Sequence, residues 1–157
     1  MKKLQLVLVA ILATSCMNEF KNNDVDFELQ QHFNAYIVEA EKRSVDWNPQ
    51  NAEYKIEFES NLKVDGVIVR GAAKRLRKGK YIHIRINKEV YKNDKAILEG
   101  IWSPLNEYTM IHECAHAFLN MGHNDIENHI MNPTTNKGLY LNKHRKSNML
   151  DQLFENH

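Results

Sequence analysis

The chain has 157 residues, 43% hydrophobic and 26% charged, which is the balance of one globular domain with no room for a second. Its 21 basic and 20 acidic residues leave a formal net charge of +1, which excludes attraction to nucleic acid or anionic lipid by a whole-molecule field. Two cysteines are too few for a disulfide framework. Partners must therefore be inferred from local sites.

The first residues have the pattern of an export signal. Lys2 and Lys3 precede an apolar run from Leu4 to Ala13, and small residues follow before Cys16. The run is shorter than a helix that spans a bilayer. We therefore predict a signal peptide over residues 1–15.

This segment resembles a bacterial lipoprotein signal, in which the cysteine after the cut is acylated and becomes the new N-terminus. The resemblance implies a lipid on Cys16, a tether over residues 16–24, and anchoring in the bacterial cell envelope, at the outer membrane or the periplasmic face. Ala13-Thr14-Ser15 also fits an ordinary signal-peptidase site, and cleavage there would release a secreted protein. Both alternatives place the protein outside the cytoplasm.

Residues 25–157 are expected to fold as a single α+β domain. Apolar residues recur at helical spacing from Val25 to about Ser44 and again from Lys143 to Asn156, which predicts a first and a last amphipathic helix. Between them, a further helix is expected to begin with Ser103 as N-cap and Pro104 as its first residue, where proline has no N–H to lose.

A sheet is predicted between the first helix and Ser103. Apolar and charged residues alternate from Lys55 to Glu59 and from Tyr81 to Ile86, and the run Val67 to Val69 is β-branched. Asp65-Gly66 predicts a turn between strands. The basic run from Lys74 to Lys80 is expected in a second turn, either as a solvated hairpin or as a patch facing membrane or substrate.

The segment His112-Glu113-Cys114-Ala115-His116 has the HExxH pattern. Histidines four residues apart lie about 40° apart around a helix, one turn displaced, so both imidazoles can reach one metal ion. Glu113 stands beside them, where a carboxylate can take a proton from a zinc-bound water as general base. Cys114 is expected to be a buried, inert thiol.

A third ligand is expected from His123. An unbroken helix would carry it about 16 Å along the axis from His112, too far for a shared metal. The helix must therefore end and the chain turn back, and Asn120 and Gly122 both tolerate the left-handed conformation that ends helices. Asp125, Glu127 and His129 are other nearby candidates, and Asp125 is the main alternative because zinc also accepts carboxylate.

From Ile101 to Pro133 the sequence resembles the metzincin zinc metalloproteases, most closely the matrixin branch and small matrixin-like lipoproteins of Bacteroidetes-type bacteria. The resemblance rests on HExxH followed by Gly122-His123, and on Ile130-Met131-Asn132-Pro133, which looks like the family's Met-turn. The methionine of this turn follows the third histidine by eight residues, the register of matrixins. The family pattern HExxHxxGxxH differs in having its third histidine one residue earlier and a glycine where this chain has Leu119.

The resemblance implies a small metzincin-like catalytic domain that hydrolyses protein or peptide substrates. It implies that Met131 lies beneath the metal, and that three histidines hold Zn²⁺: His112, His116 and His123. By the same resemblance, the strand from Ile82 to Ile86 aligns an extended peptide over the zinc. As an ordinary sheet strand, it would instead bury its isoleucines in the core.

Two other interpretations stay open. A non-catalytic zinc-binding lipoprotein of the cell envelope is the first, although structural zinc sites are closed by four protein ligands and rarely need a residue such as Glu113. A zinc-free adhesion or envelope-structural domain is the second, which zinc content distinguishes. In the enzyme, Tyr140 is a candidate for stabilising the oxyanion.

Overall fold

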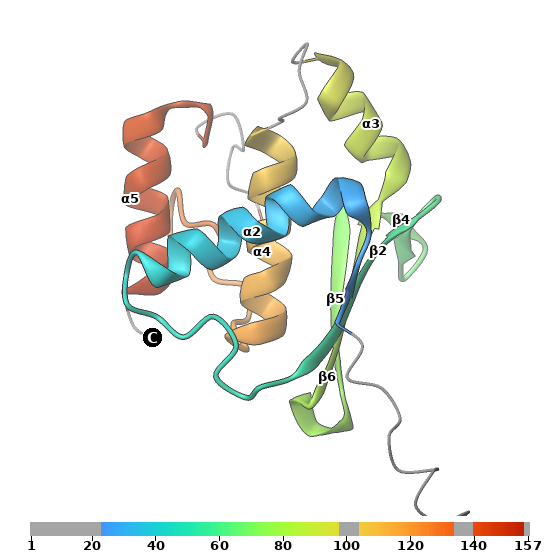
Figure 1. Ribbon diagram of the computed structural model, residues 1–157. Helices are drawn as coiled ribbons and strands as arrows, with labels where there is room; N and C mark the ends of the chain where they lie inside the picture. The colour runs from blue at the N-terminus through green and yellow to red at the C-terminus, as the bar shows by residue number, and fades with distance from the viewer. Residues whose placement is uncertain (1–22, 98–103, 134–139, 156–157) are drawn as a thin grey trace, which may run out of the picture.

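The computed structural model describes residues 23–97, 104–133 and 140–155 (Figure 1). The predicted signal peptide, the predicted lipidation site Cys16 and the predicted N-cap Ser103 lie outside these residues. No helix among the described residues is long and apolar enough to cross a membrane.

Four helices and a mixed sheet form a small domain of the predicted α+β class in the described residues. The described elements are, in chain order, β1 (Asp24–Val25), α2 (Phe27–Glu41), β2 (Glu53–Glu59), β3 (Lys63–Val64), β4 (Val67–Ile68), β5 (Gly71–Leu76), the 3-10 helix η1 (Arg77–Gly79), β6 (Tyr81–Asn87), α3 (Lys88–Ile97), α4 (Pro104–Phe118) and α5 (Lys143–Phe154). The main sheet has the order β1-β2-β6-β5, and only its edge strand β5 is antiparallel to its neighbour.

The core lies between the sheet and the pair α2 and α4, which cross on one face of it, with α5 on the side of this pair away from the sheet (Figure 1). Strand β6 buries Ile82, Ile84 and Ile86 there, because alternate side chains of a strand point to the same face. Phe33 of α2 stacks on Phe118 of α4 with ring centroids 5.9 Å apart. Apolar packing thus fixes α4 against the sheet.

Strand β6 is interior, which decides between the two interpretations of that segment. It pairs with β2 on one side and β5 on the other, so it has no free edge to align a peptide. The expectation that Ile82 to Ile86 is a substrate-aligning edge strand is wrong, and its interpretation as an ordinary core strand is confirmed. The edge position belongs to β5.

Several element boundaries differ from the prediction. Asp24 and Val25 form β1 rather than tether and helix, because they pair with β2. The residues Gly71 to Leu76, half of which were assigned to a basic turn, form β5, and the turn is limited to η1 and Lys80. Helix α3 was not predicted, although Asn87 caps it by accepting from the backbone N–H groups of Glu89 at 3.1 Å and Val90 at 3.2 Å.

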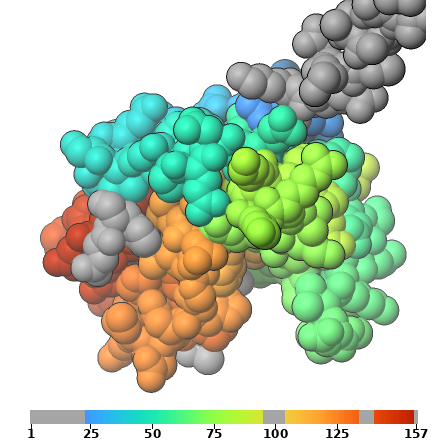
Figure 2. Space-filling model, turned by 90° about the horizontal axis from the view of Figure 1, so that it is seen from below, coloured from blue at the N-terminus to red at the C-terminus, as the bar shows by residue number. Residues whose placement is uncertain are grey.

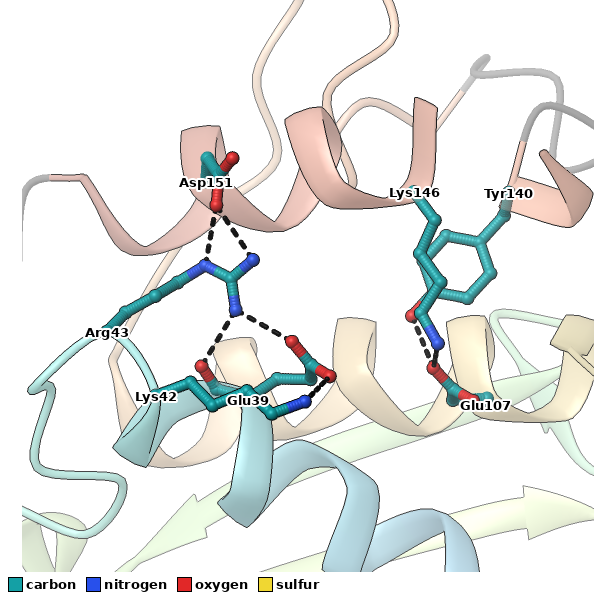
Figure 3. A network of polar contacts seen from close by, with 7 residues as sticks. All are labelled: Glu39, Lys42, Arg43, Glu107, Tyr140, Lys146 and Asp151. Carbon is teal, nitrogen blue, oxygen red and sulfur yellow. Dashed lines mark hydrogen bonds and ion pairs between the residues drawn. The ribbon is translucent and has the colours of Figure 1, made fainter. Parts of the chain in front are cut away.

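Helix α5 is capped by Asn142, whose side chain accepts from the backbone N–H groups of His144 and Arg145. It docks on the rest of the domain through polar contacts at both of its ends (Figure 3). Near its start, Lys146 forms an ion pair with the buried Glu107 of α4, which also accepts from Tyr140 Oη at 2.8 Å. Near its end, Asp151 pairs with Arg43 at 2.7 Å.

We expect Lys146→Met to lower the free energy of unfolding by about 2 kcal/mol. The Glu107 side chain is 1% exposed, and losing its cation leaves a buried charge, although Lys146, at 28% exposed, lowers the cost below that of a fully buried pair. The matched control is Lys42→Met. Lys42 forms an ion pair with Glu39 but is 61% exposed, so this pair is worth about 0.5 kcal/mol. Urea unfolding of both variants measures the two losses of stability, and equal losses would contradict the larger contribution of the Lys146–Glu107 pair.

Candidate metal centre

The end of α4 turns the chain back toward the helix. The helix stops at Phe118, and Asn120 adopts a left-handed backbone with φ of 57°. Gly122 has no such conformation, so only one of the two residues expected to end the helix does so. The Met121 N–H then donates to the Ala115 carbonyl at 3.2 Å, which holds the returning chain against the last turns of α4.

The turn brings His123 beside the two histidines of the helix. The Nε2 atom of His116 lies 3.1 Å from that of His112 and 3.1 Å from that of His123, and the third separation is 3.3 Å. These three residues could hold a metal ion. A tetrahedral zinc with bonds of about 2.0 Å to nitrogen requires separations of about 3.3 Å between its ligand atoms, so the spacing fits.

Hydrogen bonds on the far side of two rings fix their orientation. His112 Nδ1 lies 2.8 Å from the Ile130 carbonyl, and His116 Nδ1 lies 2.7 Å from the Met121 carbonyl. A carbonyl can only accept, so both Nδ1 atoms carry the proton and, in the neutral rings, both Nε2 atoms present lone pairs to each other. Two lone pairs 3.1 Å apart repel unless a proton or a metal ion lies between them, so the arrangement is one that could hold a metal ion.

The surroundings of His116 also favour its ligand form. Burial lowers its pKa, the nearby His123 lowers it further, and the hydrogen bond to the Met121 carbonyl opposes both effects. The net lowering favours the neutral ring, which is the form that binds a metal.

The predicted Met-turn lies directly behind His112. Its Ile130 carbonyl accepts from His112 Nδ1 and also from the Tyr108 hydroxyl at 2.9 Å, and Met131 is fully buried. The backbone N–H of Met131 donates to His129 Nδ1 at 3.0 Å. This role of His129 was not predicted, and no local pattern in the sequence indicates it.

Asp125 is exposed and stands outside the cluster. Among the described residues, the only group of three or more potential metal ligands brought together is that of the three histidines. The structure therefore brings His123, and not Asp125, to the other two.

A cleft of about 710 Å³ opens over the three histidines. Its walls come from α4 on one side and from β5 with the β3–β4 hairpin on the other, and Figure 2 shows the hollow between the orange segment after α4 and the green hairpin. Glu113 of α4 lines this cleft and is buried.

The tyrosine of the cleft is Tyr108, not Tyr140. Tyr140 is buried against α4, where its hydroxyl donates to Glu107, so its candidacy as an oxyanion stabiliser is wrong. Tyr108 lines the cleft, and burial raises its pKa to about 12, which keeps the hydroxyl protonated for its bond to the Ile130 carbonyl.

Gly71 lets the edge strand lie directly against the side chain of Glu113. A Cβ at this position would meet Glu113 Cγ at 2.6 Å and Oε1 at 2.8 Å, closer than any real contact. No pattern in the sequence indicates this glycine, because the need for it arises only from the packing of β5 on α4.

The peptide hydrolysis expected from the sequence should fall by roughly 10- to 100-fold in Gly71→Ala, because a displacement of catalytic groups by about 1 Å has effects of this size. Zinc content should not change, since the metal ligands are elsewhere. The matched control is Gly122→Ala, where an added Cβ meets no atom within 4 Å. Steady-state kcat/KM of both variants checks this prediction, and an unchanged value for Gly71→Ala would contradict it.

Comparison of the chain with protein-family models, with curated proteins and with solved structures found no match.

Proposed function

We propose that the protein is a zinc-dependent endopeptidase of the metzincin type. The observation that carries the proposal is the position of Glu113, which shares one cleft with three histidine Nε2 atoms that lie 3.1 to 3.3 Å apart. Three histidine ligands leave a coordination position for water or substrate, which is the arrangement of catalytic zinc sites. A structural site would close that position with a fourth protein ligand.

Bound zinc would supply Lewis-acid chemistry and make a water acidic near neutral pH. Glu113 would act on the proton of this water. It follows His112 in the chain, and its side chain lies against the backbone of Gly71. It takes the proton of the attacking water and delivers it to the amine that leaves when the peptide bond breaks.

The other residues of the centre orient its ligands. The Ile130 and Met121 carbonyls hold the rings of His112 and His116 so that both Nε2 atoms point into the cleft. Such partners fix the tautomer and raise the basicity of a metal-binding imidazole. In this proposal Met131, buried directly after Ile130, forms the apolar floor of the site.

Strand β5 provides the place for an extended peptide. It is paired with β6 on one side only, so the backbone groups on its other side are free of the sheet, and its residues 71–73 line the cleft. A peptide that adds to this edge as a further strand would lie across Glu113. This assigns to β5 the aligning role first expected of β6.

Export and a lipid on Cys16 complete the proposal, with attachment to the bacterial cell envelope as the consequence. The mass of the mature N-terminal peptide tests this part, because acylation and simple cleavage give different masses. An unmodified N-terminus after Ser15 would indicate secretion.

The experiment for the main proposal measures zinc in the purified full chain and cleavage of a quenched-fluorescence peptide library, before and after removal of metal with a chelator. About one zinc per chain, with cleavage lost on chelation and restored by zinc, is the expected result. Zinc without cleavage would favour a non-catalytic zinc-binding lipoprotein. A chain that binds no zinc would overturn the proposal.

A further inference from the structure

We propose that the β3–β4 hairpin selects the substrate by binding an apolar side chain of the peptide near the scissile bond. This inference rests on the proposed peptidase function and adds to it the class of substrate. The hairpin is a separate two-stranded sheet that is not part of the main sheet. In Figure 2 it projects on one side of the hollow.

The hairpin exposes an unusual amount of apolar surface. Val64 is 42% exposed, Val67 is 65% exposed and Ile68 is 59% exposed. Val64 and Ile68 line the same cleft as His112 and Glu113. Grouped apolar side chains left open to water commonly mark a binding surface.

The hairpin is held in place before any ligand binds. Its turn is formed by Asp65 and Gly66 with φ of 51° and 80°, the left-handed conformation that tight hairpin turns require. At its base, the Val69 N–H donates to the carbonyl of the buried Leu62 at 3.1 Å, and Asn87 Nδ2 donates to the Val69 carbonyl at 3.0 Å. A surface fixed in this way loses little conformational entropy when a peptide binds.

The hairpin continues directly from the strand that would align the peptide. Ile68 precedes Gly71 by three residues, and Gly71 lies against Glu113. A peptide paired with β5 across Glu113 therefore meets the hairpin within a few residues of the bond that is cut. The surface thus belongs to the substrate path.

The charges of the cleft favour an apolar occupant over an acidic one. Two arginines line this side of the cleft. Arg70 forms an ion pair with the buried Asp94, and Arg75 donates to the neutral Gln50 at 2.8 Å, while its Nη1 is buried out of reach of a ligand. Val64 and Ile68 provide exposed apolar surface on this side of the cleft.

The test uses the hydrolysis-deficient Glu113→Gln protein, loaded with zinc, so that binding is measured apart from cleavage. The probes are fluorescent octapeptides of Gly and Ser in which a single Leu is moved through every position. In this background, Val64→Thr and Ile68→Thr remove apolar surface but keep the β-branched shape that suits a strand. Val67→Thr is the control, because Val67 is 65% exposed on the same hairpin but does not line the cleft.

We expect one Leu position to improve binding by about tenfold, and we expect each cleft-facing variant to lose most of that gain while Val67→Thr keeps it. No preference for any Leu position, or equal losses in all three variants, would overturn the proposal. Loss of binding to phosphatidylcholine vesicles instead of peptides would also overturn it, because the hairpin would then contact a membrane. Cleavage by the wild-type chain without apolar preference would refute the hairpin's role and leave the peptidase proposal intact. Apolar preference in binding, with no cleavage by the wild-type chain, would support the hairpin's role and refute the peptidase proposal.

Discussion

Glu113→Gln is expected to lower kcat/KM for peptide hydrolysis by about 10³-fold, because removing general acid–base catalysis has effects of roughly 10²- to 10⁴-fold. The amide has nearly the same shape as the carboxylate, so it fits beside Gly71, where the space is set by β5. It cannot take the proton of the attacking water. Zinc content should remain at the wild-type level, since none of the three histidines changes.

The matched control is Glu127→Gln, which makes the same chemical change at an exposed residue that does not line the cleft. It should retain wild-type kcat/KM. Metal analysis and steady-state kinetics on the three proteins measure both quantities. Wild-type hydrolysis by Glu113→Gln would show that another group moves the proton, and loss of zinc from that variant would show a structural defect instead of a chemical one.

The helices that were predicted are those with a long apolar stripe. Helices α2 and α5 bury one face each, so the 3.6-residue period is visible in the sequence. Helix α4 was found from Pro104 and the HExxH motif. Helix α3 is short and mostly polar, and its clearest signal, the cap residue Asn87, is also the last residue of strand β6.

Strand β5 was not predicted, because its sequence, Gly71 to Leu76, has no β-branched residue. Its conformation comes from pairing with β6 and packing on α4, which are contacts between distant parts of the chain. The order of strands has the same origin, so the sequence did not reveal that β6 is covered on both sides. Local pattern identified strands, and tertiary contacts decided which of them is the edge.

The candidate site divides in the same way. The spacing of His112 and His116 on one helix predicted that both could reach one ion, since helix geometry alone determines it. The groups that orient their rings are the Met121 and Ile130 carbonyls, and every residue has a carbonyl, so no side-chain pattern could indicate them. The need for Gly71 also arises only where two elements meet.

His123→Ala is expected to weaken zinc binding by more than roughly 100-fold, because loss of an outer partner of a ligand already costs 10- to 100-fold and loss of a ligand costs more. His123 is exposed, so its truncation should leave the fold intact. Asp125→Ala is expected to keep wild-type zinc affinity, because Asp125 lies outside the cluster. Competition with a chromophoric chelator measures both affinities.

His144→Ala is the matched control, since it removes an exposed histidine on α5, away from the cleft. Weak binding in His123→Ala alone would assign the third ligand, and weak binding in Asp125→Ala would assign the carboxylate instead. The longer spacing of eleven residues between the first and third histidines is then explained by Asn120. A continued α4 would carry His123 away from His112. The left-handed backbone of Asn120 turns the chain back instead, and His123 Nε2 comes to lie 3.3 Å from that of His112.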